Sequence, residues 1–248
     1  MGCKVHVMSV GTSALRNFQR TLTDKERVAQ ALTKLERGEL TIKDLEKVLS
    51  SEGMTLKDLI EEMLKFVKQY PVQASAELNA FTKKVKEVGI PEKVVLLCSD
   101  TEAGELSCEV LRRYFEGEGI DASAYVINGL GKGQFYEGLV NLMCAYKKIL
   151  DKEVGEGESV CVNPTGGFKP ESAVTYLLAL SDPRTADIYY IHEAFRDVVS
   201  LPVIPFQPLK SVLASARWLE EPLNNLKKCL EGASINPWRP LRITEYLT

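Results

Sequence analysis

Short apolar runs alternate with longer amphipathic segments between residues 94 and 204. The runs typical of buried strands cover 94–98, 122–127, 159–163, 187–191 and 198–204. Helical spacing fills the intervals at 105–116, 134–150 and 170–180, and an earlier strand-like run covers 4–10. Strands and helices that alternate at these lengths form a mostly parallel sheet with right-handed crossovers. We therefore predict an α/β, Rossmann-like fold with helices on both faces of the sheet.

A long charged segment, at about 21–88, interrupts this rhythm after the first strand. Its leucines recur at helical spacing, as in Leu32-x-x-Leu35 and Leu45-x-x-x-Leu49. Expected helix starts are Thr23-x-x-Glu26 and Thr41-x-x-Asp44, and expected helix ends are Gly38 and Gly53. We predict a helical insertion whose charged faces are solvated rather than catalytic, with residues 71–77 as the exception to watch.

The last forty residues differ from the rest in their proline content. We predict one α/β domain over 1–206 and a short helical C-terminal extension over 207–248, with a helix at 210–230. Three roles stay open for this extension: packing on the sheet, contributing to a dimer interface, or continuing into a longer natural protein.

Composition narrows the classes of protein. The 248 residues are 45% hydrophobic, which is ordinary for a globular chain that buries a sizeable core. No apolar run approaches the ~20 residues of a membrane span, and the N-terminus lacks a signal pattern. We expect a cytoplasmic protein without a membrane partner. The net charge of −3 argues against a broad surface for duplex nucleic acid.

The six cysteines are scattered and include no Cys-x-x-Cys pair, and the chain has two histidines. Several cysteines lie in strand-like runs, where the thiol behaves as a small buried hydrophobe. We therefore expect neither a zinc site nor a disulfide framework, and no metal or other cofactor.

The strongest candidate for chemistry is the segment Asn163-Pro164-Thr165-Gly166-Gly167-Phe168-Lys169. It lies where a strand should end and a helix begin, so unpaired N–H groups and two glycines would let a phosphate approach the backbone. Thr165 adds a hydroxyl and Lys169 a charge. The plain alternative is a Gly-Gly turn that only closes the connection.

Two other expected strand ends carry similar residues. Gly11-Thr12-Ser13 follows the first run, and Ser99-Asp100-Thr101 follows the second, with Asp100 or Thr101 suited to cap the next helix. In an open parallel sheet these ends meet at one edge, which is where ligands bind.

Other motifs fail. The glycine cluster at 129–133 has Gln134 where a dinucleotide fingerprint needs its third glycine, and no phosphate loop of the Gly-x-x-x-x-Gly-Lys type is present. His6 lies mid-strand, and neither it nor His192 accompanies a nucleophile elbow.

Four motifs together resemble the CRISPR-associated Rossmann-fold (CARF) proteins, in the branch of ring nucleases and of the sensor halves of type III CRISPR ribonucleases. They are Ser9-x-Gly11-Thr12-Ser13, Gln73-Ala74-Ser75-Ala76-Glu77-Leu78, Ser99-Asp100-Thr101-x-x-Gly104 and Asn163-x-Thr165-Gly166-Gly167-Phe168-Lys169. The resemblance covers about residues 4–206, so it implies that the α/β domain over 1–206 is a CARF domain.

The resemblance implies a two-fold homodimer that binds a cyclic oligoadenylate, with four adenylates favoured and six also compatible. It implies metal-independent cleavage, with Lys169 stabilising charge and Ser13, beside Thr12, orienting the ribose 2′-OH. The implied ligand-binding residues are Ser9, Gly11, Arg16, Asn17, Glu77, Ser99, Asp100, Thr101, Gly131, Phe135, Asn163, Thr165, Gly166, Gly167 and Phe168. The loop 129–135 would act as a lid.

Two alternatives remain open at the level of sequence. A non-cleaving sensor domain of a larger ribonuclease would use nearly the same binding residues. A mononucleotide or dinucleotide enzyme on a generic Rossmann sheet is weakened by the failed glycine fingerprint.

Overall fold

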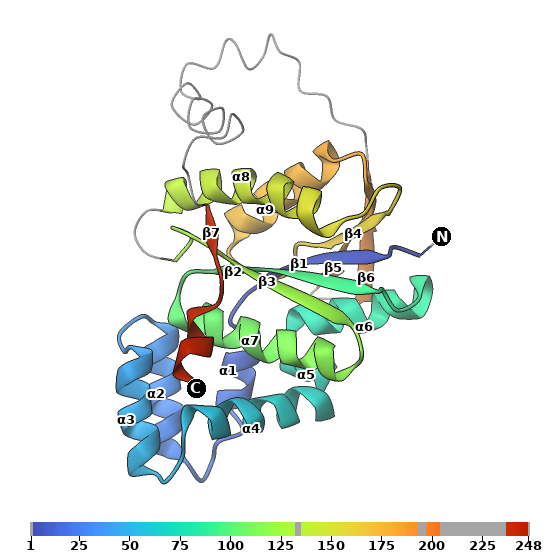
Figure 1. Ribbon diagram of the computed structural model, residues 1–248. Coiled ribbons are helices and arrows are strands. Elements are labelled where there is room, and N and C mark those ends of the chain that lie inside the picture. Colours follow the sequence, from blue (N-terminus) through green and yellow to red (C-terminus); the bar gives the residue numbers. More distant parts are fainter. Residues whose placement is uncertain (1, 132–134, 193–196, 204–236, 248) are drawn as a thin grey trace.

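A seven-stranded sheet organises the molecule (Figure 1). The computed structural model describes residues 2–131, 135–192, 197–203 and 237–247. The strands are β1 (Val5–Val10), β2 (Lys93–Ser99), β3 (Asp121–Ile127), β4 (Val160–Asn163), β5 (Thr185–His192), β6 (Asp197–Leu201) and β7 (Trp238–Arg239). Their order is β6-β5-β4-β1-β2-β3-β7; the five inner strands are parallel, and both edge strands are antiparallel to their neighbours. The predicted α/β, Rossmann-like fold is confirmed.

Helices cover both faces of this sheet. On one face lie α8 (Phe135–Glu153) and α9 (Lys169–Ser181), and on the other lie α6 (Ala76–Val88) and α7 (Glu102–Gly117), as Figure 1 shows. Alternate residues of β1 enter the two cores: Val7 packs under α8 and α9, whereas Met8 packs toward α7. This alternation follows from the two-residue period of a strand, and it explains why β1 and β4 are buried along their whole length.

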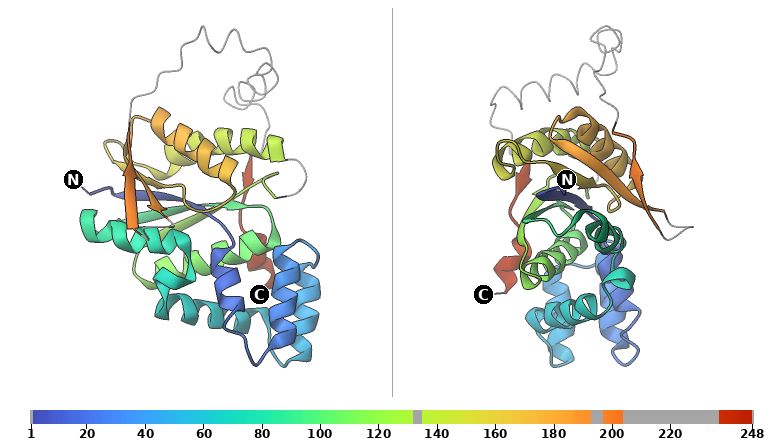
Figure 2. Two further views of the ribbon diagram at one scale, coloured as in Figure 1. Left: turned by 180° about the vertical axis from the view of Figure 1, so that it is seen from behind. Right: turned by 90° about the vertical axis from the view of Figure 1, so that its right-hand side faces the viewer.

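The predicted helical insertion is present. After α1 (Ser13–Gln19) the chain forms α2 (Glu26–Glu36), α3 (Ile42–Ser51), α4 (Leu56–Gln69) and the short α5 (Pro71–Ala74) before α6. Figure 2 shows these helices on the α7 side of the sheet. Leu32, Leu45 and Leu59 are fully buried in the core that α7 also enters. The insertion therefore shares a core with the sheet domain.

The boundaries of the insertion helices follow the expected capping signals in part. Thr41 caps α3 by accepting a hydrogen bond from the Asp44 N–H, as expected. Gly38 and Gly53 end their helices with φ of 71° each, a conformation that favours glycine. The expectation for Thr23 is wrong: α2 begins at Glu26 without a side-chain cap.

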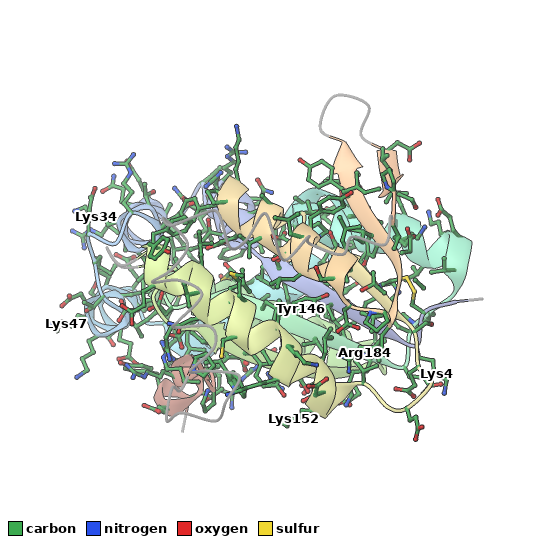
Figure 3. The ribbon with its side chains drawn as sticks, turned by 90° about the horizontal axis from the view of Figure 1, so that it is seen from above. Lys4, Lys34, Lys47, Tyr146, Lys152 and Arg184 are labelled. Atoms are coloured by element: carbon green, nitrogen blue, oxygen red, sulfur yellow. A yellow bond between two sulfur atoms is a disulfide. The ribbon has the colours of Figure 1, made fainter. Side chains whose placement is uncertain are left out.

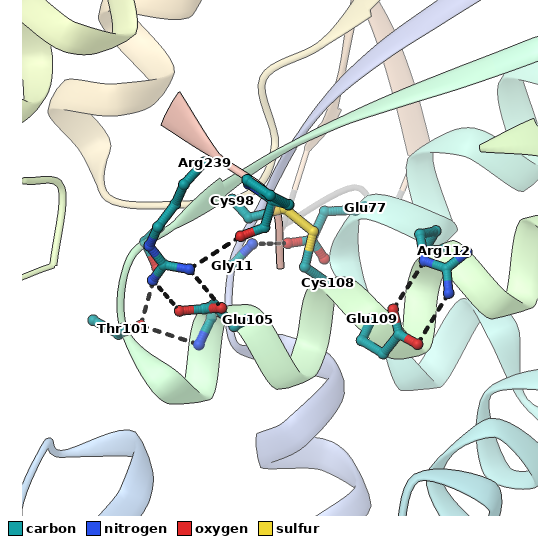
Figure 4. Close-up of a disulfide and its surroundings, with 12 residues drawn as sticks. Gly11, Glu77, Cys98, Thr101, Glu105, Cys108, Glu109, Arg112 and Arg239 are labelled. Carbon is teal, nitrogen blue, oxygen red and sulfur yellow. Dashed lines mark hydrogen bonds and ion pairs between the residues drawn. A yellow bond between two sulfur atoms is a disulfide. The ribbon is translucent and has the colours of Figure 1, made fainter. Parts of the chain in front are cut away.

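The C-terminal residues join the sheet. Trp238 pairs with Ile127 across β7 and β3, and Ile243 is buried in the core beneath α7. Glu105 forms an ion pair with Arg239 (Figure 4). It also accepts the Arg242 N–H at 2.7 Å. The described part of segment 207–248 is thus continuous with the sheet, while the predicted helix at 210–230 lies outside the described residues.

The expectation of no disulfide framework is wrong. Cys3 is bonded to Cys161, and Cys98 is bonded to Cys108 (Figure 4). Cys161 lies on β4 opposite His6 of β1, so the residues just before β1 reach it although 158 positions separate the two cysteines. Such proximity depends on strand order, which cysteine spacing does not reveal.

Within the described residues, no helix is both long and apolar enough to cross a membrane.

Candidate functional site

A cavity of about 610 Å³ opens at the carboxyl ends of β1, β2 and β4. The three strand ends predicted to converge do so, because parallel strands end at one edge of the sheet. The insertion supplies a further wall. The lining residues are Val10, Gly11, Thr12, Ser13, Arg16, Glu36, Arg37, Ala76, Glu77, Ser99, Thr101, Thr165, Gly166, Gly167, Phe168 and Glu171.

The first turn, Gly11 to Ser13, connects β1 to α1 and is held by the buried carboxylate of Glu77. The Gly11 N–H donates to Glu77 Oε1 at 2.7 Å (Figure 4), and the Ser13 hydroxyl donates to Glu77 Oε2 at 2.8 Å. Ser75 donates to the same Oε2 at 2.5 Å. The Ser13 oxygen also accepts the Ala76 N–H at 3.2 Å. Ser13 is therefore fixed by two contacts, and the Gly11 amide already has an acceptor.

A second carboxylate, Glu36 at the end of α2, holds the remaining polar groups of this turn. Its Oε1 accepts from the Thr12 hydroxyl at 2.8 Å and from Arg16 Nε and Nη2 at 2.9 and 2.5 Å. Burial opposes ionisation of Glu36, but the hydrogen bonds from Arg16 and Thr12 keep its pKa below the ordinary value. The insertion thus contributes Glu36 to the cavity wall, a position that the sequence pattern did not indicate.

Glycines let the first turn touch the turn after β4. A Cβ on Gly166 would collide with the Ser9 carbonyl oxygen and with Glu77 Oε1. A Cβ on Gly11 would lie 2.9 Å from the Gly167 nitrogen. The Gly-Gly pair thus serves close backbone packing between the two turns, in addition to any role in ligand approach.

The second turn, Thr165 to Lys169, is held mainly by its own neighbours. Asn163 Oδ1 accepts the Thr165 N–H at 3.2 Å, and Glu171 Oε2 accepts the Phe168 N–H at 2.9 Å. The Gly167 N–H donates to no acceptor in the described part of the chain. Lys169, the first residue of α9, is exposed and has no ion pair with any described residue. This turn keeps an amide and a cation available.

The third turn, after β2, is mostly structural. Thr101 caps α7 by accepting the Gly104 N–H at 3.0 Å, which is one of the two caps that the sequence allows. Asp100 instead accepts the N–H groups of Gly129 and Gly131 at 2.9 and 2.6 Å. Asp100 thereby fixes the start of the glycine loop, whose residues 132–134 lie outside the described part.

The charges of the wall nearly balance. Two arginines, Arg16 and Arg37, face three carboxyl groups, Glu36, Glu77 and Glu171. Burial raises the pKa of Glu171 to about 7, and the Asp100 charge adds to the effect. Glu171 is 5% exposed, and its Oε1 has no hydrogen-bond partner among the described residues. A neutral Glu171 would lower the negative charge that an anion meets there.

Several other cations lie away from this cavity. Figure 3 shows Lys34 and Lys47 at the insertion end and Lys4 and Arg184 at the opposite end of the molecule. Lys47 pairs with Asp44, and Arg184 pairs with Asp182. Positive potential in the cavity therefore depends on its own arginines, on Lys169 and on the start of α9.

The structure separates the predicted site residues into two groups. On the cavity wall lie Gly11, Thr12, Ser13, Arg16, Glu77, Ser99, Thr101, Thr165, Gly166, Gly167 and Phe168. The other predicted site residues are not among its lining residues: Ser9, Asn17, Asp100, Gly131, Phe135, Asn163 and Lys169. Ser9 contacts Thr175, and Asn17 donates to the carbonyls of Gln73 and Ala74. The Phe135 ring packs against the edge of Phe168 at 6.2 Å.

Sequence reasoning missed Glu36, Arg37 and Glu171. Arg37 precedes the helix-ending Gly38, but nothing local shows that this helix end returns to the sheet edge. Glu171 had a weak signal, since it stands three residues after Phe168, the spacing of a carboxylate that caps the start of a helix.

Among the described residues, one group has metal-binding chemistry: Cys3, His6 and Cys161, all buried. The two sulfurs are joined in a disulfide, so they do not offer thiolates. Burial lowers the pKa of His6 to about 4, and Lys84 adds to the shift, while Nδ1 contacts the Tyr189 hydroxyl at 2.9 Å. Cys3 precedes β1, His6 lies near its start and Cys161 lies on β4, so this group is not at the carboxyl ends of the strands that form the cavity.

More than half of the chain matches a known protein family. The model of a CRISPR-associated protein family, Cas_APE2256, matches residues 72–204. The chain belongs to this CARF-type family. The match begins just before Glu77 and ends after β6, so it contains the second and third turns and the carboxylate that holds the first. Family membership assigns the protein a CRISPR-related role.

Proposed function

We propose that this member of the Cas_APE2256 family binds a cyclic oligoadenylate, with cyclic tetra-adenylate favoured, and cleaves it without a metal ion. Cleavage of this second messenger would switch off type III CRISPR signalling. The observation that carries the proposal is the meeting of a fixed hydroxyl, Ser13, with an open amide, Gly167, at one edge of the sheet.

Ser13 is suited to orienting a nucleophile. Its proton is donated to Glu77 and one lone pair accepts the Ala76 N–H, so one lone pair remains. That lone pair can accept a hydrogen bond from a ribose 2′-OH. The fixed rotamer removes the entropy cost of aligning the hydroxyl at the moment of reaction.

The second turn is suited to the phosphate. The Gly167 N–H is available as a donor, and Lys169 stands beside it at the start of α9, where the helix dipole favours an anion. Lys169 would stabilise the charge that develops on the phosphoryl oxygens or on the leaving oxygen.

The proposed reaction is an internal transfer. The 2′-hydroxyl loses its proton as its oxygen attacks the adjacent phosphorus, the bond from phosphorus to the 5′-oxygen breaks, and the 5′-oxygen takes up a proton. The products are a 2′,3′-cyclic phosphate and a free 5′-hydroxyl. Two such cleavages convert cyclic tetra-adenylate into two linear di-adenylates, and neither cleavage consumes water.

A homodimer would place two identical half-sites across one ring. Two large apolar side chains of this region face outward on the single chain: Phe168 is 60% exposed and Leu177, on α9, is 52% exposed. Contact between two copies near α9 would cover them and would bring both second turns together. Light scattering of the purified protein tests the expected dimer.

The second candidate function is a binding-only sensor. The hydrogen bonds of Arg16 and Thr12 to Glu36 favour it, because donors that bind a carboxylate are suited to binding an anion and do not themselves supply a reacting group. We expect a cytoplasmic protein that uses this local site and does not bind duplex nucleic acid.

The deciding experiment is a single-turnover assay with radiolabelled cyclic tetra-adenylate in EDTA, with enzyme in excess. We expect conversion to linear di-adenylate with a cyclic phosphate end. Ser51→Ala, which changes an exposed serine of α3 outside the cavity, is the matched control for Ser13→Ala.

The expected pattern is slow cleavage by Ser13→Ala with little loss of binding, and unchanged cleavage by Ser51→Ala. Tight binding of an intact ring by the wild type would establish the sensor instead. If neither cyclic tetra-adenylate nor cyclic hexa-adenylate binds, the remaining hypothesis is a nucleotide enzyme on a generic Rossmann sheet.

A further inference from the structure

Two carboxylates of the insertion accept hydrogen bonds from four donors of the first turn and of α1. Glu77 accepts from the Gly11 N–H and the Ser13 hydroxyl, and Glu36 accepts from the Thr12 hydroxyl and the Arg16 guanidinium. Donors of these kinds also bind phosphate, since a phosphodiester offers the same single charge and similar acceptor oxygens as a carboxylate. The protein thus already holds anions of its own at this turn.

The two carboxylates differ in how firmly they are held. Glu77 is 1% exposed, and both its oxygens accept hydrogen bonds. The Glu36 side chain is 17% exposed, and one of its oxygens accepts all three hydrogen bonds from Thr12 and Arg16. Its partner Arg16 is more exposed still, at 55%. An ion pair at such a solvated wall is weak and can exchange partners, whereas Glu77 cannot leave without stranding a buried charge.

We infer that Glu36 competes with the phosphates of the ligand for Arg16 and Thr12 and so sets the affinity of this site for anions. The identity of the ligand rests on the proposed function. On binding, Arg16 and Thr12 turn from the Glu36 carboxylate to a phosphate oxygen, and Glu36 remains at the wall, partly exposed to solvent. No covalent bond changes in this step.

The neighbouring residue strengthens the inference. Arg37 lies on the same wall, is exposed, and has no ion pair with any described residue. The end of α2 therefore presents one guanidinium that is available to a phosphate and one carboxylate that withholds another. Removal of the carboxylate charge leaves Arg16, Arg37 and Lys169 all open to the ligand, so binding should tighten.

Glu36→Gln is the variant that tests whether removal of the carboxylate charge tightens binding. The amide keeps the size of the side chain and retains a carbonyl acceptor, but it removes the charge. We expect cyclic tetra-adenylate to bind about 2- to 5-fold more tightly than to the wild type, the range of a solvated ion pair. The matched control is Glu52→Gln, which removes the same charge from the insertion where Glu52 pairs with Arg27 at 3.5 Å, outside the cavity. The control should leave the dissociation constant unchanged.

A double-mutant cycle tests the route of the effect. Arg16→Ala should weaken binding about 10-fold, as expected for loss of a charged contact to phosphate. If Glu36 acts by binding Arg16, the increase in affinity caused by Glu36→Gln shrinks toward zero in the Arg16→Ala background. A full gain in that background, or weaker binding by Glu36→Gln alone, would mean that Glu36 does not compete for Arg16, and the inference would be overturned.

A second probe separates this inference from the proposed function. Inorganic pyrophosphate is titrated against wild type, Glu36→Gln and Glu52→Gln, with the midpoint of thermal unfolding as readout. A larger upward shift of the unfolding midpoint for Glu36→Gln than for Glu52→Gln supports the competition, even if no cyclic oligoadenylate binds. The absence of such binding would contradict the proposed function alone. Equal shifts in all three proteins would overturn the competition while leaving ring cleavage intact.

Discussion

The first turn, Gly11 to Ser13, and the second turn, Thr165 to Lys169, follow parallel strands of one sheet edge, yet their donors are used differently. The first turn has its donors bound by Glu36 and Glu77 of the insertion. The second leaves the Gly167 amide and the Lys169 ammonium without a protein acceptor among the described residues. Two similar sequence motifs therefore have different physical roles: the first is fixed in place, and the second is open to an incoming charge.

The largest expected effect separates the two turns by function. Lys169→Ala should slow single-turnover cleavage by about 10²- to 10³-fold and weaken binding, because a charge that meets the transition state is lost. Lys65→Ala, at an exposed position of α4, is the matched control and should cleave at the wild-type rate. Quench-flow or gel analysis of the products measures both. Normal cleavage by Lys169→Ala would remove the charge-stabilising role of the second turn.

The next effect concerns pH and the carboxyl group beneath the second turn. Burial raises the pKa of Glu171 to about 7, above its ordinary value of 4.5. The folded protein then binds more protons than the unfolded chain between these values, so the contribution of Glu171 to stability is lost as the pH rises from 4.5 to 7. The lost contribution is about 3 kcal/mol.

Glu171→Gln isolates this contribution, since the amide oxygen can still accept the Phe168 N–H. The free energy of unfolding of the variant, minus that of the wild type, should rise by about 3 kcal/mol between pH 4.5 and 7. His6, whose pKa is lowered to about 4, stabilises both proteins as the pH rises from 4 to 6.5, and it cancels in the difference. Urea unfolding at four pH values measures it; a pH-independent difference would contradict the assignment.

A smaller effect tests how the first turn is held. Glu77→Gln should lower the free energy of unfolding by about 2 kcal/mol, because an amide nitrogen would face donors that now meet a carboxylate oxygen. Glu39→Gln, at an exposed position whose side chain has no hydrogen bond or ion pair with a described residue, is the control. Chemical denaturation measures both. Equal stability of the two variants would show that Glu77 does not fix the first turn.

The smallest effect compares two glycines of positive φ. Gly38→Ala places a side chain at a φ of 71°, and Gly167→Ala places one at 85°. The backbone strain lowers the free energy of unfolding by about 1 kcal/mol in each variant. A Cβ at Gly38 would meet nothing within 4 Å, whereas a Cβ at Gly167 would collide with Glu171 Oε2. Only Gly167→Ala should also weaken ligand binding, as isothermal titration would show. If both variants bind the ligand equally well, the Gly167 backbone does not contact the ligand.

Short-range patterns in the sequence were enough to predict much of the site. Strand alternation and the polar residues after each run placed Gly11, Ser99 and Gly166 together at one edge of the sheet, and all three line the cavity. Capping at Thr41 and Thr101 was also predictable, because each cap uses donors within three residues. Asp100 shows the limit: its side chain binds a loop about thirty residues away rather than the local helix.

The α/β fold, the helical insertion and the three turns could be predicted from the amino-acid sequence, because periodicity and turn chemistry act between near neighbours. The binding of the first turn by Glu36 and Glu77, across 24 and 64 positions, and the bond between Cys3 and Cys161 became known only from the three-dimensional structure. The physical reason is that these contacts depend on how helices pack against a sheet and on strand order. Many side chains scattered along the chain set that packing together, and no local motif records it.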